Sequence, residues 1–169
     1  VRRSFGPQEV LRGLDLEIAT GEILVVIGRS GGGKSVLLKH LIGLLRPDAG
    51  RILVDDVDIT RLGRTALDRI RERYGVVFQG GALFDSMSVH ENVAFPLREK
   101  TRLRAAEIIQ KLQEKLAQVG LEGMGAKNPA EISGGMRKRV AIARALVTEP
   151  EVVFFYEPTT VLDPILVNT

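Results

Sequence analysis

Apolar residues recur along this chain with a period of two in some stretches and a period of about 3.6 in others. The first pattern is typical of β-strands, in which neighbouring side chains point to opposite faces of a sheet. Short runs that are wholly apolar and rich in β-branched or aromatic residues predict buried strands. By these criteria we expect strands within Val10–Ala19, Ile23–Ile27, Arg51–Val54, Gly75–Phe78 and Val152–Tyr156.

Other stretches carry apolar residues at the three- and four-residue spacing of an amphipathic helix. They are Val36–Leu45, a short helix within Leu67–Tyr74, Arg104–Val119, and Ser133–Val147, which begins with Ser133 as its N-cap. Glycine and serine interrupt a mixed stretch from Gln79 to Pro96, to which the pattern assigns no single element. Strands that alternate with helices predict an α/β fold, in which Arg104–Val119 looks like part of a helical insertion.

The stretch Gly28–Ser35 reads Gly-Arg-Ser-Gly-Gly-Gly-Lys-Ser and fits the phosphate-binding pattern of glycine, four residues, glycine, lysine and serine. It joins the predicted strand Ile23–Ile27 to the helix that follows, which is the context that the motif requires. Glycines let the backbone N–H groups point inward, and the helix N-terminus favours an anion. A flexible glycine-rich turn is the alternative. The expected nucleotide contacts are Gly28, Arg29, Ser30, Gly31, Gly32, Gly33, Lys34, Ser35 and Val36.

Composition and charge exclude only a few classes of protein and site. The chain has 169 residues, of which 44% are hydrophobic, so one domain with a substantial core is expected. The formal net charge of +3 does not demand a nucleic-acid partner, and the absence of cysteine excludes disulfides and thiolate chemistry. The apolar runs are too short to cross a bilayer, and the N-terminus lacks the order of a signal peptide. A membrane would have to be supplied by a partner.

Four motifs occur in a fixed order: the phosphate loop, Gln79, Ile132-Ser-Gly-Gly-Met136 and Tyr156-Glu-Pro-Thr-Thr-Val-Leu-Asp163. With them, the chain resembles the nucleotide-binding subunit of an ABC transporter over nearly its whole length. The resemblance implies a P-loop NTPase core of the RecA type, formed by residues 1–79 and 137–169. It also implies a helical subdomain, residues 80–136, that ends in the signature motif.

A finer resemblance lies in Phe78–Asp85, in Asn92–Arg98 and in the Ile-Ser-Gly-Gly-Met form of the signature. These stretches look like the ATPase of Mla-type transporters, which move phospholipid between bacterial membranes. This implies a homodimer, membrane permease subunits and an MCE-type lipid-binding protein as partners, without nucleic acid. It also implies a location at the cytoplasmic face of the bacterial inner membrane, peripheral through the permease. An importer of another solute is the alternative within the family.

The resemblance also implies roles for single residues, with ATP and Mg²⁺ as cofactors. Phe5 matches the aromatic residue that stacks on adenine, although a core aromatic at a strand end is the alternative. Ser35 and Gln79 would hold magnesium, and Gln79 would also sense the attacking water. Glu157 matches the general base that activates this water. The remaining matches are Ser133, Gly134 and Gly135, which would close over the γ-phosphate of the opposite subunit, and Asp163, which would link the two sites.

Three departures from the family pattern bear on activity. Tyr156 stands where an aspartate normally precedes the catalytic glutamate, and a neutral phenol cannot offset the charge of magnesium. Val161 stands where glycine is usual. The family's switch histidine has no counterpart, because His40 and His90 both lie upstream. Together with a start at Val1 rather than Met, this suggests part of a longer protein that lacks its last strands and helices.

Three functions therefore compete. The first is an ATPase motor subunit that closes a dimer on ATP and resets after hydrolysis. The second is a nucleotide-binding module that does not hydrolyse ATP, which the three departures favour. The third, an ABC-type ATPase of DNA repair or chromosome structure, is disfavoured because the chain has no sustained heptad pattern.

Overall fold

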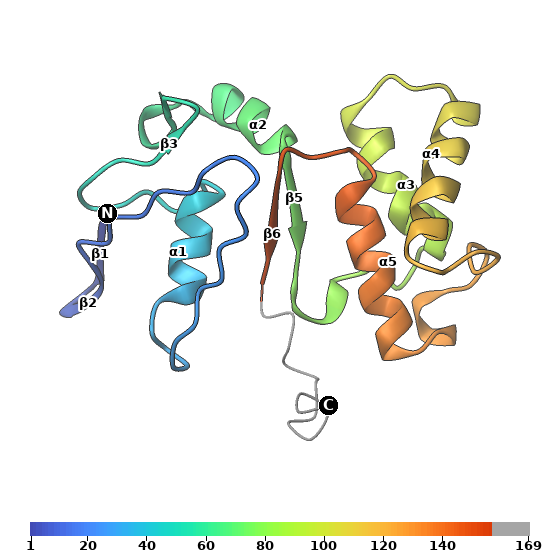
Figure 1. The fold of residues 1–169 in the computed structure, drawn as a ribbon, viewed down its shortest axis with the longest axis horizontal. Helices are drawn as coiled ribbons and strands as arrows, with labels where there is room; N and C mark the ends of the chain where they lie inside the picture. The colour runs from blue at the N-terminus through green and yellow to red at the C-terminus, as the bar shows by residue number, and fades with distance from the viewer. Residues whose placement is uncertain (157–169) are drawn as a thin grey trace. The chain divides into compact units, whose positions relative to one another are not determined.

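The computed structural model describes residues 1–156, and residue contacts divide the chain into two compact units, residues 1–71 and 72–169 (Figure 1). The α/β fold class predicted from the sequence is confirmed, since both helices and strands form. Within the described residues, no helix combines the length and apolar character that a membrane span requires. The predicted core of residues 1–79 and 137–169, with 80–136 as a subdomain, stays a prediction.

The first unit begins with a hairpin of β1 (Arg2–Phe5) and β2 (Gln8–Arg12), which pair antiparallel with an irregularity between Arg3 and Ser4. The backbone of Arg2 also pairs with Ala49, so the hairpin is tied to a later turn. A small apolar core forms around Ile52, Ile59 and Leu67. The remaining elements are α1 (Lys34–Leu41), β3 (Leu53–Val54), β4 (Val57–Asp58), η1 (Ile59–Arg61) and α2 (Arg64–Glu72).

Two strand predictions in this unit are wrong wholly or in part. Ile23–Ile27 has no strand partner among the described residues, and both Ile23 and Ile27 are 90% exposed. A β-branched run favours extended backbone, but a strand exists only where a neighbouring strand completes its hydrogen bonds. Likewise, residues 14–19 are irregular, and only β2 forms within the predicted Val10–Ala19. The helix predicted to reach Leu45 ends at Leu41, with Gly43 at positive φ.

The second unit places a helical cluster beside a parallel pair of strands. Strand β5 (Tyr74–Val77) pairs with β6 (Val152–Phe155), and Val77 is in register with Phe155. Figure 1 shows α5 (Gly134–Leu146) between this pair and helices α3 (Val89–Lys100) and α4 (Ala105–Gln118). Two 3₁₀ helices, η2 (Gln79–Gly81) and η3 (Pro129–Glu131), complete it. Strand β6 is only partly buried, because Val152 and Phe155 are exposed, which corrects the expected burial.

Helices α4 and α5 confirm the predicted spans to within a residue at each end. Helix α3 was not predicted, because Pro96 and the preceding serines made its sequence look broken. A local signal was present: Ser88 is the N-cap, its Oγ accepts from the Glu91 N–H at 3.2 Å, and Glu91 Oε2 accepts from the Ser88 N–H at 2.7 Å. Such a reciprocal capping box indicates the start of a helix, even though Pro96 lies within it.

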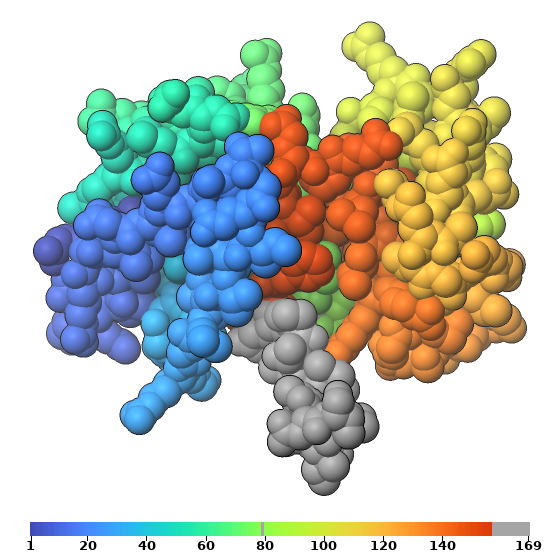
Figure 2. Space-filling view, in the orientation of Figure 1, coloured from blue at the N-terminus to red at the C-terminus, as the bar shows by residue number. Residues whose placement is uncertain are grey.

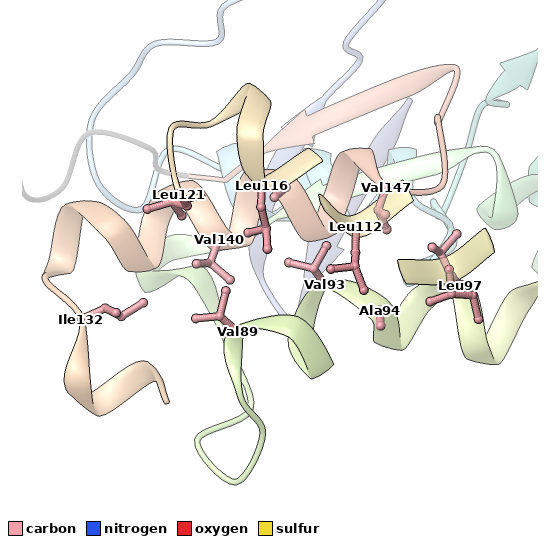
Figure 3. Packing of buried hydrophobic residues seen from close by; sticks show 12 residues of the cluster. Val89, Val93, Ala94, Leu97, Leu112, Leu116, Leu121, Ile132, Val140 and Val147 are labelled. Carbon is pink, nitrogen blue, oxygen red and sulfur yellow. The ribbon is translucent and has the colours of Figure 1, made fainter. Parts of the chain in front are cut away.

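One apolar cluster holds the three helices together (Figure 3). Each helix contributes one stripe to it, and most of these side chains are almost wholly buried, as expected for amphipathic helices that cover one another. The labelled members are Val89, Val93, Ala94 and Leu97 from α3, Leu112 and Leu116 from α4, Val140 from α5, and Leu121, Ile132 and Val147 from the flanking segments.

Acid should weaken this helical cluster through Glu91. Hydrogen bonds from the Ser88 N–H and hydroxyl lower the pKa of Glu91 below its ordinary value. A carboxyl whose pKa is lower in the folded state stabilises the fold above its unfolded pKa of about 4.3. That stabilisation is lost as the pH falls through the folded pKa.

We therefore expect Glu91→Gln to lose less thermal stability than the unmodified protein between about pH 6 and about pH 3. Glutamine can still accept the N-cap hydrogen bond but does not titrate. Melting by circular dichroism across this range measures the difference. Glu99→Gln, on the same helix but outside the capping box, is the control. Equal acid sensitivity of the Glu91→Gln protein and the unmodified one would contradict the prediction.

Candidate functional site

The phosphate loop in the first unit is shaped by Gly33, the N-cap of α1. Gly33 has a φ of +89°, and a Cβ at this position would lie 3.0 Å from Cγ1 of Val10 on β2. Both the backbone conformation and the close approach of β2 therefore require glycine. Gly31 also has positive φ, at +77°. The loop thus turns sharply into α1 while it packs against β2.

A cavity of about 370 Å³ lies along this loop. Its lining comes from β2 and the residue pair after it, from the end of the Ile23–Ile27 run, and from the loop and α1. Lys34 projects back onto the loop, where its Nζ donates to the carbonyls of Gly28 at 2.7 Å and Arg29 at 2.9 Å. A phosphate oxygen that binds Lys34 has to compete with these two carbonyls. The lining residues are Val10, Leu11, Arg12, Gly13, Leu14, Val26, Ile27, Gly28, Gly32, Gly33, Lys34 and Leu37.

Ser35 and Val36 belong to the first turn of α1, where helix N–H groups point towards the N-terminal end. Ser35 is also the residue expected to hold magnesium. Magnesium is usually bound by one or two carboxylates together with substrate phosphates. In residues 1–156 no group of three or more His, Cys, Asp or Glu is placed to hold a metal ion. That Ser35 and Gln79 hold magnesium stays a prediction.

Phe5 ends β1, opposite Gln8 of β2, and is 45% exposed. The exposed ring argues against the alternative of a core aromatic. Phe5 is not among the described residues that line the cavity. Its hairpin nevertheless reaches the loop, because β2 also carries Val10, whose side chain meets Gly33.

In the second unit, Gln79 and Tyr156 leave the same edge of the strand pair. Strands β5 and β6 are parallel, so their carboxyl ends lie together, and the Tyr156 N–H donates to the Val77 carbonyl at 2.9 Å. Gln79 begins η2 two residues after Val77. This confirms that the motif residues follow strand ends, where ligands of parallel sheets bind. Glu157, Val161 and Asp163 lie outside the described residues.

The signature residues begin α5 as predicted. Ser133 is the N-cap, and its Oγ accepts from the Met136 N–H at 3.2 Å, while Gly134 and Gly135 form the first turn. The segment after Gln79 packs on the same helix: a Cβ at Gly81 would lie 3.2 Å from the Cβ of Ala141. One helix therefore carries the signature at its start and supports the Gln79 segment along its side.

Arg144 of α5 binds the segment after Gln79 through hydrogen bonds to its backbone carbonyls. Its guanidinium donates to Gly81 O at 2.7 Å and to Ala82 O at 2.9 Å. The same group lies 5.7 Å from the ring centre of Phe84. Partial burial lowers the pKa of Arg144, but an arginine remains charged at neutral pH. The guanidinium of Arg144 thus binds the segment that follows Gln79.

Asn92 of α3 holds the other side of this segment. It is fully buried, accepts from the Phe84 N–H at 2.8 Å and donates to the Phe84 carbonyl at 3.0 Å. Its amide also donates to the carbonyls of Met87 and Ser88. Neither Asn92 nor Arg144 was predicted, because their partners are set by tertiary contacts. The one available signal for Arg144 was a charged residue among alanines on a helix that is otherwise apolar at its end.

A sequence model of one protein family, described as "ABC transporter", matches residues 11–160. The chain is 50% identical over 163 residues to the probable ribonucleotide transport ATP-binding protein mkl of Mycobacterium leprae, covering 96% of this chain. It is 45% identical over 160 residues to the intermembrane phospholipid transport system ATP-binding protein MlaF of Haemophilus influenzae, covering 95% of this chain.

The fold is similar to a dimeric, post-hydrolysis structure of an ATP-binding cassette bound to ADP and Pi, with a TM-score of 0.84. The identity is 32%, and the match covers 97% of this chain and 73% of the other. By contrast, the chain spans 47% of the mycobacterial relative and 61% of the Haemophilus one. Phe5 and Asp163 fall outside the matched range 11–160.

Replacing Arg144 should loosen the segment after Gln79. Arg144→Met keeps the length of the side chain but leaves two carbonyls without their charged donor, which should lower the free energy of unfolding by about 1.5–3 kcal/mol. Urea denaturation measures this loss, and hydrogen exchange should show faster exchange in residues 81–88. Arg98→Met, at an exposed position on α3, is the control. If both variants exchange alike, Arg144 does not hold this segment.

Proposed function

This chain belongs to the ABC transporter family, and we propose that it is the nucleotide-binding part of a transporter's ATPase subunit, with ATP as its ligand. The observation that carries this proposal is the loop at α1. There, Gly33 at positive φ turns the chain into a helix N-terminus, and Lys34 points back along the loop. A helix N-terminus and an ammonium group beside it together suit a polyphosphate.

In this proposal Gly28–Val36 cradles the phosphates of ATP, and Lys34 exchanges its two carbonyl partners for phosphate oxygens. The N-terminus of α5, with Ser133, Gly134 and Gly135, faces the nucleotide of a second copy. The support is that the cap leaves the first turn of α5 with an exposed, positive helix end. The dimeric form of the similar cassette, with ADP and Pi bound, supports two copies as the working unit.

For hydrolysis we assign Glu157 as general base and Gln79 as the residue that orients water. Magnesium, when bound through Ser35 and Gln79, would neutralise the phosphate charge. Tyr156 is the observation that favours a second function, binding without turnover. A phenol stands here in place of the carboxylate that magnesium usually uses together with substrate phosphates. Loss of an outer partner of a metal typically lowers affinity or activity by about 10- to 100-fold.

We further propose phospholipid as the transported molecule, with permease subunits and an MCE-type lipid-binding protein as partners. The support is the named function of the Haemophilus relative, which is an intermembrane phospholipid transport ATPase. The mycobacterial relative is instead named for ribonucleotide transport, so another solute is the alternative. The subunit would lie on the cytoplasmic face of a bacterial inner membrane, held there by the permease.

ATP titration tests the nucleotide proposal and the effect of Tyr156 together. We expect the chain to bind ATP with little enhancement by magnesium. The Tyr156→Asp variant should bind about 10- to 100-fold more tightly when magnesium is added, because the carboxylate restores an outer partner of the metal. Isothermal titration calorimetry with and without magnesium measures both affinities.

Lys34→Ala is the control in this experiment, since it removes the ammonium group and leaves α1 intact. Failure of the unmodified chain to bind ATP, or binding that Lys34→Ala leaves unchanged, would overturn the nucleotide proposal. Magnesium enhancement that is equal in the unmodified chain and in Tyr156→Asp would overturn only the role assigned to Tyr156.

The lipid proposal is tested by purifying the protein complex that contains this chain from its host in mild detergent. We expect phospholipid and an MCE-type protein in the complex, because a lipid carrier must be shielded from water by its partners. Mass spectrometry identifies both. A solute-binding protein without any MCE partner would show that the chain powers an importer instead.

A further inference from the structure

The exposed ring of Phe5 carries a cation on one face. The guanidinium carbon of Arg3 lies 4.8 Å from the ring centre, which is within the range of a cation–π interaction. Arg3 therefore covers one face of the ring, and the exposed area of Phe5 belongs to the rest of it. An aromatic ring whose second face is accessible can stack on a nucleotide base.

Asp48 holds Arg3 in this position. Asp48 Oδ1 accepts from Arg3 Nη1 at 2.6 Å, and Oδ2 accepts from the Ser4 N–H at 2.7 Å. The hydrogen bond from Ser4 lowers the pKa of Asp48, so the carboxylate is charged at neutral pH. One carboxylate thus fixes the side chain before Phe5 and the backbone directly next to it.

The turn that contains Asp48 is itself tied to β1. The Arg2 N–H donates to the Ala49 carbonyl at 2.8 Å, and the Asp48 N–H donates to the Arg2 carbonyl at 2.9 Å. The Arg46 carbonyl accepts a further, longer bond from Arg3 Nη1. Arg3 Nε, by contrast, is buried and has no hydrogen-bond partner. The guanidinium is therefore oriented by Nη1 and by the ring.

The same hairpin reaches the phosphate loop. Phe5 is in register with Gln8, and Val10, two residues further along β2, packs against Gly33. Two residues of a strand span about 7 Å. The ring is thus carried on a strand pair whose other strand lines the cavity at the phosphate loop.

From these contacts we infer that Arg3 and Asp48 are positioning residues for base binding: Asp48 anchors Arg3, and Arg3 holds one face of Phe5 so that the other face takes the base of a nucleoside triphosphate. This inference rests on the proposed function, because it concerns the base end of the same ligand. Neither residue touches the nucleotide. Their effect is confined to the base, and the phosphate contacts at Lys34 do not depend on them.

Comparison of ATP with inorganic triphosphate separates the two ends of the ligand, because triphosphate has the same phosphate chemistry without a base. Phe5→Ala should weaken ATP by about 5- to 150-fold, the range expected for base stacking. Arg3→Met, which keeps an apolar stem over the ring, and Asp48→Asn, which keeps an acceptor for Ser4, should each weaken ATP by about 2- to 5-fold. All three should leave the triphosphate affinity unchanged.

Glu9→Gln is the matched control, since Glu9 lies on the same hairpin and forms an ion pair with Arg2 rather than with Arg3. It should leave both affinities unchanged. If the Arg3 and Asp48 variants weaken ATP and triphosphate equally, or weaken neither, the inference is wrong. If Phe5→Ala loses ATP affinity but Arg3→Met and Asp48→Asn do not, Phe5 binds the base but Arg3 and Asp48 do not position it, and the inference is overturned. An unmodified chain that binds neither ligand would instead overturn the proposed function itself.

Discussion

Three arginines of α5 each donate hydrogen bonds to two backbone carbonyls of the segments that pack on this helix. Arg144 binds the carbonyls of Gly81 and Ala82. Arg139 binds those of Val119 and Gly120, and Arg137 binds those of Pro129 and Ile132. A single guanidinium can supply donors to two carbonyls at once. The apolar cluster holds the helices together, but these bonds determine how the connecting segments run over α5.

Elements of the fold were predictable where apolar periodicity and the capping or breaking residues indicated the same element. Helices α4 and α5 combine apolar periodicity with clear ends, and both formed as expected. The prediction failed at Ile23–Ile27, where the composition of the run favours a strand but no partner strand is present among residues 1–156. It also missed α3, although Ser88 and Glu91 form a capping box. The backbone hydrogen bonds of a strand need a distant segment, whereas those of a helix form within the helix itself, so strands are harder to predict from local sequence.

In the candidate site, too, locally encoded features were predictable and those that depend on distant residues were not. The phosphate loop, the cap at Ser133 and the placement of Gln79 after β5 follow from short motifs, and the sequence predicted each position. The residues that hold these motifs in place could not be predicted. Arg3 pairs with Asp48, 45 positions away, and Arg144 bonds to Ala82, 62 positions away. No local pattern encodes such pairs. Motifs therefore identify the candidate ligand contacts, and only the structure identifies the residues that hold them.

Lys34 shows why this distinction matters for the energetics of binding. Its ammonium already has two carbonyl partners, so a phosphate gains only the difference between its own hydrogen bonds and those it replaces. Charge-assisted bonds to phosphate are the stronger ones, and the positive end of α1 adds to them. None of these proposed phosphate contacts distinguishes one polyphosphate from another, so selection of a nucleotide would have to come from elsewhere. In the proposed site, the aromatic ring held on the hairpin would offer that selection, since little conformational freedom would be lost when a base stacks on it.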